Sequence, residues 1–125
     1  MILQTIIQVA IKCGWRVEAI VRVDGSMTFD FRRRTASGVP FRFSTDMTDN
    51  NPATLVADIV SFVDAFHPAI FARKWCRLAE AGESRRSQIA ADMDGIRSHA
   101  WLLAVAISEA FGNPESNSPP WYLLN

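Results

Sequence analysis

The sequence predicts an α+β fold: an N-terminal helix, a three-stranded antiparallel meander, and then three helices of which the last is long. Three observations predict this order. Apolar residues recur every three or four positions at the start of the chain, then alternate with polar residues, and near the end form a long heptad-like pattern. The 125 residues suit one domain, so we expect a single α+β domain over residues 1–112 and a Pro/Ser-rich tail over residues 113–125.

The first helix is predicted over residues 2–13, and Gly14 can close its last turn. Its β-branched residues would also fit a strand, which is the alternative. Strands are predicted at about residues 15–23, 26–33 and 39–45, each with alternate residues facing the core. The apolar residues expected to face inward are Trp15, Val17, Ala19, Val21, Val23, Phe29, Phe31, Phe41 and Phe43.

The turn between the first two strands determines their register. A two-residue Asp-Gly turn would place Ile20 opposite Phe29, and so pair a solvent-facing position with a core-facing one. A three-residue loop over residues 23–25, with Gly25 in the left-handed conformation at a bulge, pairs Ala19 with Phe29 instead. We therefore expect the bulged turn.

Three helices are predicted after the sheet, each with an apolar face. The residues that bound them are Asn51-Pro52, His67, Pro68, Gly82, a Ser84 cap and Gly112. The inward-facing residues expected on the first two are Leu55, Ile59, Phe62, Val63, Phe66, Phe71, Trp75, Leu78 and Ala79. On the last helix the spacing alternates between four and three through Ile89, Met93, Ile96, Ala100, Leu103, Ile107 and Ala110.

Composition excludes several classes of protein. Hydrophobic residues make up 49% of the chain and charged residues 21%, as in globular domains, and thirteen Lys+Arg balance thirteen Asp+Glu. Cys13 and Cys76 are too few for a disulfide scaffold or a zinc motif and suit a reducing cytosol. The apolar start lacks a cationic segment, and the longest apolar run, residues 100–107, is too short to span a bilayer. We expect a cytoplasmic protein with no membrane partner.

The order helix, three strands, helix is also that of a double-stranded-RNA-binding domain. Such domains present lysines at the start of the second helix to phosphates of the RNA. Here residues 46–70 contain four acids and no Lys or Arg, a net charge of −4 that would repel phosphate. We therefore do not expect this activity.

Arginines are the strongest candidates for a binding surface. Residues 1–45 hold seven Lys or Arg against three acids, a difference of +4. The outer face of the sheet should present Arg16, Arg22, Arg32 and Arg42, with Arg33 and Arg34 adjoining it, and a second basic stripe consists of Arg73, Lys74 and Arg77. Each set either binds an acidic protein or a phosphate backbone, or is simply a solvated face with Arg/acid pairs.

Catalytic signals are weak. His67 lies beside a helix-breaking proline, and His99 follows Asp92 by seven residues, but no third ligand or orienting partner is evident. Cys76 is next to Trp75, which favours buried packing over a reactive thiolate. We expect no enzyme activity, no metal site and no cofactor.

Apolar residues outside the main stripe of the last helix are candidates for an interface. Trp101, Leu102 and Val105 lie at other angles of this helix, so a second side has to be covered. Either the tail, whose tip carries Trp121 and Tyr122, folds over it, or another protein does, and we expect a homodimer.

The stretches Gly14-Trp15-Arg16-Val17-Glu18, Asp24-Gly25-Ser26-Met27-Thr28-Phe29-Asp30-Phe31, Pro40-Phe41-Arg42-Phe43-Ser44 and Asn51-Pro52 resemble uncharacterised small proteins of gut Bacteroides-type bacteria and their mobile elements. The resemblance implies a bacterial, mobile-element setting and transfers no functional residue. Our leading hypothesis is a non-enzymatic protein-interaction module, a regulator or inhibitor of a bacterial defence or DNA-processing complex. The alternative is a weak nucleic-acid-binding accessory protein that uses the arginine face.

Overall fold

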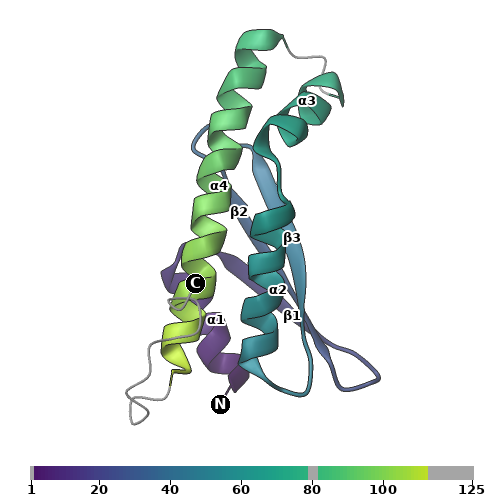
Figure 1. Ribbon diagram of the computed structural model, residues 1–125, viewed down its shortest axis with the longest axis vertical. Coiled ribbons are helices and arrows are strands. Elements are labelled where there is room, and N and C mark those ends of the chain that lie inside the picture. The colour runs from purple at the N-terminus through teal and green to yellow at the C-terminus, as the bar shows by residue number, and fades with distance from the viewer. Residues whose placement is uncertain (1, 79–81, 113–125) are drawn as a thin grey trace.

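The computed structural model describes residues 2–78 and 82–112, and it has the predicted α+β arrangement (Figure 1). The described elements, in chain order, are α1 (Ile2–Lys12), β1 (Arg16–Val21), β2 (Met27–Arg34), β3 (Pro40–Met47), α2 (Pro52–Ala65), α3 (Pro68–Leu78) and α4 (Glu83–Ala110). The first segment is thus a helix and not a strand, because its apolar residues fall on one side of a helix with Ile6 and Ala10 buried at its centre.

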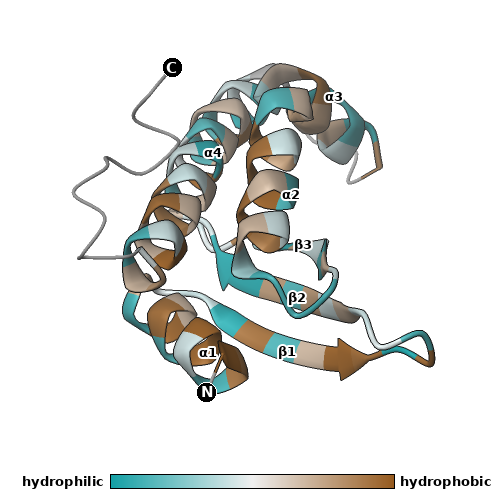
Figure 2. Cartoon of the chain, turned by 60° about the horizontal axis from the view of Figure 1, so that its bottom comes forward, coloured by the Kyte–Doolittle hydropathy of each residue, from teal (hydrophilic) through white to brown (hydrophobic). Residues whose placement is uncertain are grey.

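The helices lie on one face of the sheet and leave the other face open (Figures 1 and 2). The sheet has the order β1-β2-β3, with both pairs antiparallel. On the covered face, α1 packs beside β1, and α2 packs beside β3. The long α4 contacts α1, α2 and α3, and therefore joins the sheet layer to the outlying α3.

The hairpin between β1 and β2 has the predicted bulged turn. Ala19 is opposite Phe29, and Gly25 has a φ of 88°, which an L side chain rarely adopts. The backbone N–H and the hydroxyl of Ser26 both donate to the Asp24 carboxylate, at 2.9 and 2.6 Å. These two hydrogen bonds lower the pKa of Asp24. The turn keeps the phenylalanines of β2 on the covered face.

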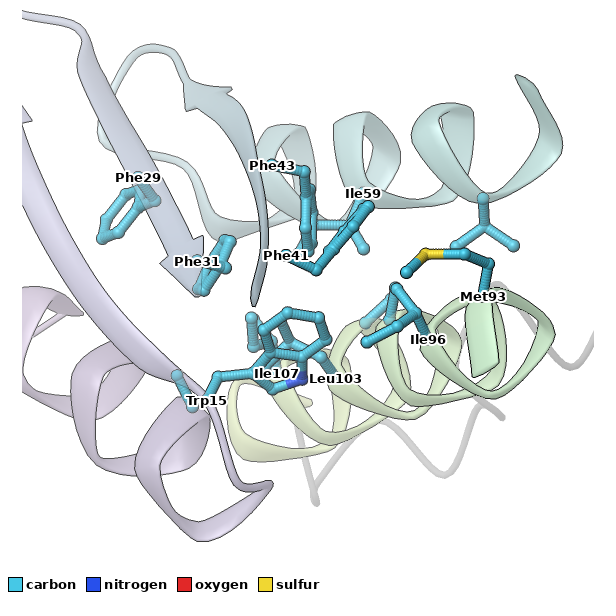
Figure 3. Packing of buried hydrophobic residues seen from close by; sticks show 14 of the residues in the cluster. Trp15, Phe29, Phe31, Phe41, Phe43, Ile59, Met93, Ile96, Leu103 and Ile107 are labelled. Carbon is cyan, nitrogen blue, oxygen red and sulfur yellow. The ribbon is translucent and has the colours of Figure 1, made fainter. Parts of the chain in front are cut away.

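Aromatic rings from the sheet fill the space beneath the helices (Figure 3). Phe29, Phe31, Phe41 and Phe43 are all buried, as predicted, and the ring of Phe43 stacks on that of Phe62 in α2 with centroids 4.2 Å apart. The predicted stripe of α4 closes this core from the other side. Its buried members are Ile89, Met93, Ile96, Ala100, Leu103 and Ile107.

Five predicted positions are wrong in detail. The end of β1 projects past α1 (Figure 2), so Val21 is 64% exposed and Val23 fully exposed although both have core-facing parity. Leu78 is 87% exposed because it ends α3, and Ala110 is exposed at the end of α4. The cap of α4 is Gly82, and Ser84 already lies inside the helix. Ala79 falls outside the described residues.

None of the described helices is both long and apolar enough to cross a membrane alone; only α2 and α3 taken together, with a bend of 71°, pass that test.

Candidate anion-binding groove

Three arginines form a row across the open face of the sheet. Arg16 of β1 is directly opposite Arg32 of β2, and Arg32 is directly opposite Arg42 of β3. Like charges in directly opposed positions destabilise a sheet. Folding therefore brings together three positive charges that a bound anion would stabilise.

Two acids in the adjacent row offset part of this charge. Asp30 is buried and accepts from Arg32 Nε at 2.8 Å, while Arg42 lies 4.0 Å from the same carboxylate. Glu18 is 3.4 Å from Arg32. Arg16 and Arg34 make no ion pair with the residues that the structure describes; Arg34 donates to the Gly38 carbonyl at 2.8 Å. These two guanidinium groups keep most of their capacity for a ligand.

Arg33 points toward the helices and not onto the open face. Its position in β2 has the same parity as Phe31, and its guanidinium lies over the Trp15 ring at 5.0 Å. It donates to the Cys13 carbonyl at 3.5 Å, but its buried Nε has no acceptor among residues 2–78 and 82–112. Burial lowers the pKa of Arg33, and it raises that of the nearby Cys13 thiol.

A groove of about 740 Å³ lies at the end of the sheet that carries these arginines. Residues of both faces line it, because Arg33 and Phe41 have the parity of the covered face. Its lining residues are Gly14, Arg16, Arg32, Arg33, Arg34, Pro40, Phe41 and Arg42, so it contains five arginines and no acid. The planar guanidinium group binds carboxylates and phosphates through paired N–H donors, and is therefore suited to either anion. We call this site the arginine groove.

Arg22, another predicted site residue, is not part of the groove. It lies at the other end of the sheet, where its Nε donates to the Thr28 hydroxyl at 2.7 Å and its NH2 is 3.7 Å from Asp46. The acidic row of Glu18 and Asp30 separates it from Arg16 and Arg32 along the strands. The predicted arginine face is therefore divided into two parts of different character.

The second basic stripe is exposed on α3 and does not line the groove. Arg73, Lys74 and Arg77 are all solvent-exposed. Trp75 on the same helix is partly buried, with the Arg85 guanidinium 5.7 Å from its ring. The structure thus separates the two predicted basic sets.

Asp92 and His99 make no hydrogen bond or ion pair with each other in the described part of the chain. Asp92 accepts from the Thr35 hydroxyl at 2.9 Å and from the Ser37 N–H at 3.1 Å, which fastens the β2–β3 turn to α4. His99 is solvent-exposed, but partial desolvation and the positive charge of Arg33 lower its pKa. Cys76 is buried, as predicted. No cluster of potential metal ligands occurs within the described part of the chain.

The predicted interface residues on α4 are accessible in part. Trp101 is 38% exposed and Leu102 is 54% exposed, while Val105 is half-buried. Trp121 and Tyr122 lie outside the described residues. The α4 helix contacts α1, α2 and α3, and Ala104, outside the predicted stripe, is buried as well.

Three groove residues were not among the sequence candidates: Gly14, Pro40 and Phe41. No sequence signal marks them, because they line the groove through its shape and not through their charge. The inward direction of Arg33 did have a signal, since it shares the odd parity of Phe29 and Phe31.

The chain matches no known family model, and comparisons with curated proteins and with solved structures found no significant similarity.

Proposed function

We propose that this protein is a non-enzymatic interaction module that binds an acidic segment of a partner protein in the arginine groove. The observation that carries the proposal is the row of Arg16, Arg32 and Arg42 across three strands, with Arg34 beside it. Because like charges in this arrangement oppose folding, bound carboxylates would relieve an unfavourable interaction as well as form new hydrogen bonds.

The charge pattern beside the groove favours a protein over a nucleic acid. The row of arginines spans two strand spacings, about 10 Å, and is followed along the strands by the acids Glu18 and Asp30. A protein partner can present matching acidic and basic groups, whereas a phosphate backbone is negative along its whole length. The described residues of the open sheet face include no aromatic side chain on which bases could stack.

The resemblance to proteins of bacterial mobile elements suggests which partners to test first. Components of a bacterial defence or DNA-processing complex fit that setting, and a small module without a catalytic site would regulate or inhibit such a complex by occupying one of its acidic surfaces.

The experiment compares the binding of two labelled probes by fluorescence polarisation. The probes are a peptide of consecutive glutamates and a single-stranded oligonucleotide of equal net charge. The groove variant is Arg16→Ala with Arg34→Ala, because these arginines make no described ion pair and their loss should leave the fold intact. The matched control is Arg73→Ala with Lys74→Ala on α3, which removes the same charge outside the groove.

We expect the groove variant to weaken peptide binding about tenfold and the control to leave it nearly unchanged. Tighter binding of the oligonucleotide, lost in the groove variant and steeply dependent on salt, would replace this proposal with nucleic-acid binding. Equal losses in both variants, or no binding of the peptide, would also overturn it.

A further inference from the structure

The two edges of the sheet differ in how their backbone groups are satisfied. At β3, Pro40 has no N–H to offer, and the N–H of Asp46 donates to the Asp58 carboxylate of α2 at 2.7 Å. A proline and an occupied donor protect this edge against pairing with another strand. The described edge of β1 has neither a proline nor a backbone N–H that is occupied by a side chain.

The free edge of β1 presents the backbone groups of Val17, Ala19 and Val21. The N–H of Arg22 donates to the Ser26 carbonyl at 2.8 Å, so residues of even number direct their peptide groups toward β2. The odd-numbered residues therefore direct theirs away from the sheet. No hydrogen bond from the described residues reaches these outward groups.

Apolar side chains surround the same edge. Ile20 is 54% exposed on the open face, while Val21 and Val23 are exposed on the face that the helices cover elsewhere. Figure 2 shows the hydrophobic end of β1 extending past α1. An exposed edge strand with β-branched residues on both faces is a template for pairing with another strand.

We propose that β1 pairs antiparallel with β1 of a second copy of this chain, with the two Ile20 residues facing each other across the twofold axis. In this register Ala19 is opposite the partner's Val21, and Glu18 is opposite the partner's Arg22. The twofold symmetry forms each pair twice. The dimer then contains one continuous sheet of six strands.

Charge selects this register over its neighbours. Opposed residues must lie on the same face of the sheet, so the twofold axis passes between two copies of the same residue. Moving the axis by one residue shifts the register by two. With the axis at Glu18, the two copies of Glu18 face each other. With the axis at Ala19, Arg16 faces the partner's Arg22, and with the axis at Val21, Glu18 faces the partner's Asp24. Each of these three registers places like charges opposite each other, whereas the register with the axis at Ile20 pairs only unlike charges.

This inference is independent of the proposed binding to the arginine groove. Pairing about an axis perpendicular to the sheet leaves both open faces on the same side of the dimer. The two rows of Arg16, Arg32 and Arg42 would therefore face one direction, so an acidic partner with two segments could engage both.

Sedimentation equilibrium on the full chain tests the proposal with two charge-reversal variants. Glu18→Arg places an arginine opposite the partner's Arg22, and Arg22→Glu places a glutamate opposite the partner's Glu18. Both side chains are exposed, so their replacement should leave the fold intact, which circular dichroism checks. We expect each variant alone to dimerise about tenfold more weakly than the natural chain.

Mixing the two variants provides the decisive measurement. A heterodimer of the Glu18→Arg chain with the Arg22→Glu chain restores unlike charges at both pairs, so dimers should reappear on mixing. Arg73→Glu on the exposed side of α3 is the matched control and should not affect dimerisation. A natural chain that stays monomeric, a dimer insensitive to both reversals, or a mixture that does not re-form dimers would each overturn the proposal. A dimer disrupted only by Leu102→Glu would place the interface on α4 instead.

Discussion

Phe31 belongs to the aromatic cluster of the sheet, which reaches the helices through Phe41 and Phe43. Its ring centroid is 5.3 Å from that of Phe43 and 6.3 Å from that of Trp15, and the side chain is fully buried. Phe31→Ala should lower the free energy of unfolding by about 3–5 kcal/mol, because it removes apolar contacts and leaves a cavity. Urea denaturation measures the loss. Leu78→Ala, at an exposed apolar residue, is the control, and an equal loss there would contradict this account of the core.

Asp92 connects two parts of the chain that are far apart in sequence. Removing its carboxylate in Asp92→Ala leaves the Thr35 hydroxyl and the Ser37 N–H without their acceptor, so stability should fall by about 1–3 kcal/mol at neutral pH. Asp94→Ala, at an exposed neighbouring residue, should cost far less.

The contribution of Asp92 should also depend on pH. Desolvation alone would raise the pKa of this carboxyl, but the hydrogen bonds from Ser37 and Thr35 lower it below its ordinary 3.8. A carboxyl with a lowered folded pKa stabilises the protein above its ordinary pKa and loses that effect as pH falls through the folded value. The difference between the natural chain and Asp92→Ala should therefore shrink in acid, and a constant difference would contradict the assignment.

At the level of the elements, two glycines have opposite roles. Gly25 has a φ of 88° in the β1–β2 turn, so Gly25→Ala should destabilise the protein by about 1 kcal/mol. Gly95 lies inside α4 with open space where a Cβ would be, so Gly95→Ala should stabilise it by up to about 1 kcal/mol. Thermal unfolding compares the two variants. The same sign for both would show that one of these backbone conformations is wrong.

For the whole molecule, His99 should report on whether the arginine groove is occupied. Partial desolvation and the charge of Arg33 lower the pKa of His99, and Arg33 also lines the groove. An anion in the groove would offset the charge of Arg33 and raise this pKa. NMR titration of the imidazole in sulfate and in chloride at equal ionic strength should show the higher pKa in sulfate. Arg33→Gln should remove the difference, and equal values in both salts would count against an anion site at Arg33.

The same histidine predicts the direction of a stability change. As pH falls below the ordinary histidine pKa of 6.5, the unfolded chain binds a proton before folded His99 does. Stability should therefore decrease from that pH down to the lowered folded pKa, and the slope should be smaller in His99→Gln.

Local patterns in the sequence were sufficient for most of the architecture. The alternation around Phe29 and Phe31 predicted which face of the sheet is buried, and parity selected the bulged turn at Gly25. The spacing in residues 89–107 predicted the buried side of the last helix. Such patterns succeed because backbone geometry alone decides the face on which each side chain lies. The same geometry places Arg16, Arg32 and Arg42 on the open face, while Arg33, which adjoins them, has the parity of the covered face.

Tertiary packing decided what covers each face and which distant groups meet. Val21 has core-facing parity yet is exposed, because α1 does not extend over the end of β1. Asp92 meets Thr35 across 57 residues of sequence, and Arg16, Arg32 and Arg42 come from three separate strands to form one row. These outcomes depend on where each helix or strand ends and on how the elements pack together. Contacts between residues far apart in the sequence determine both. Periodicity within a single segment contains no information about them.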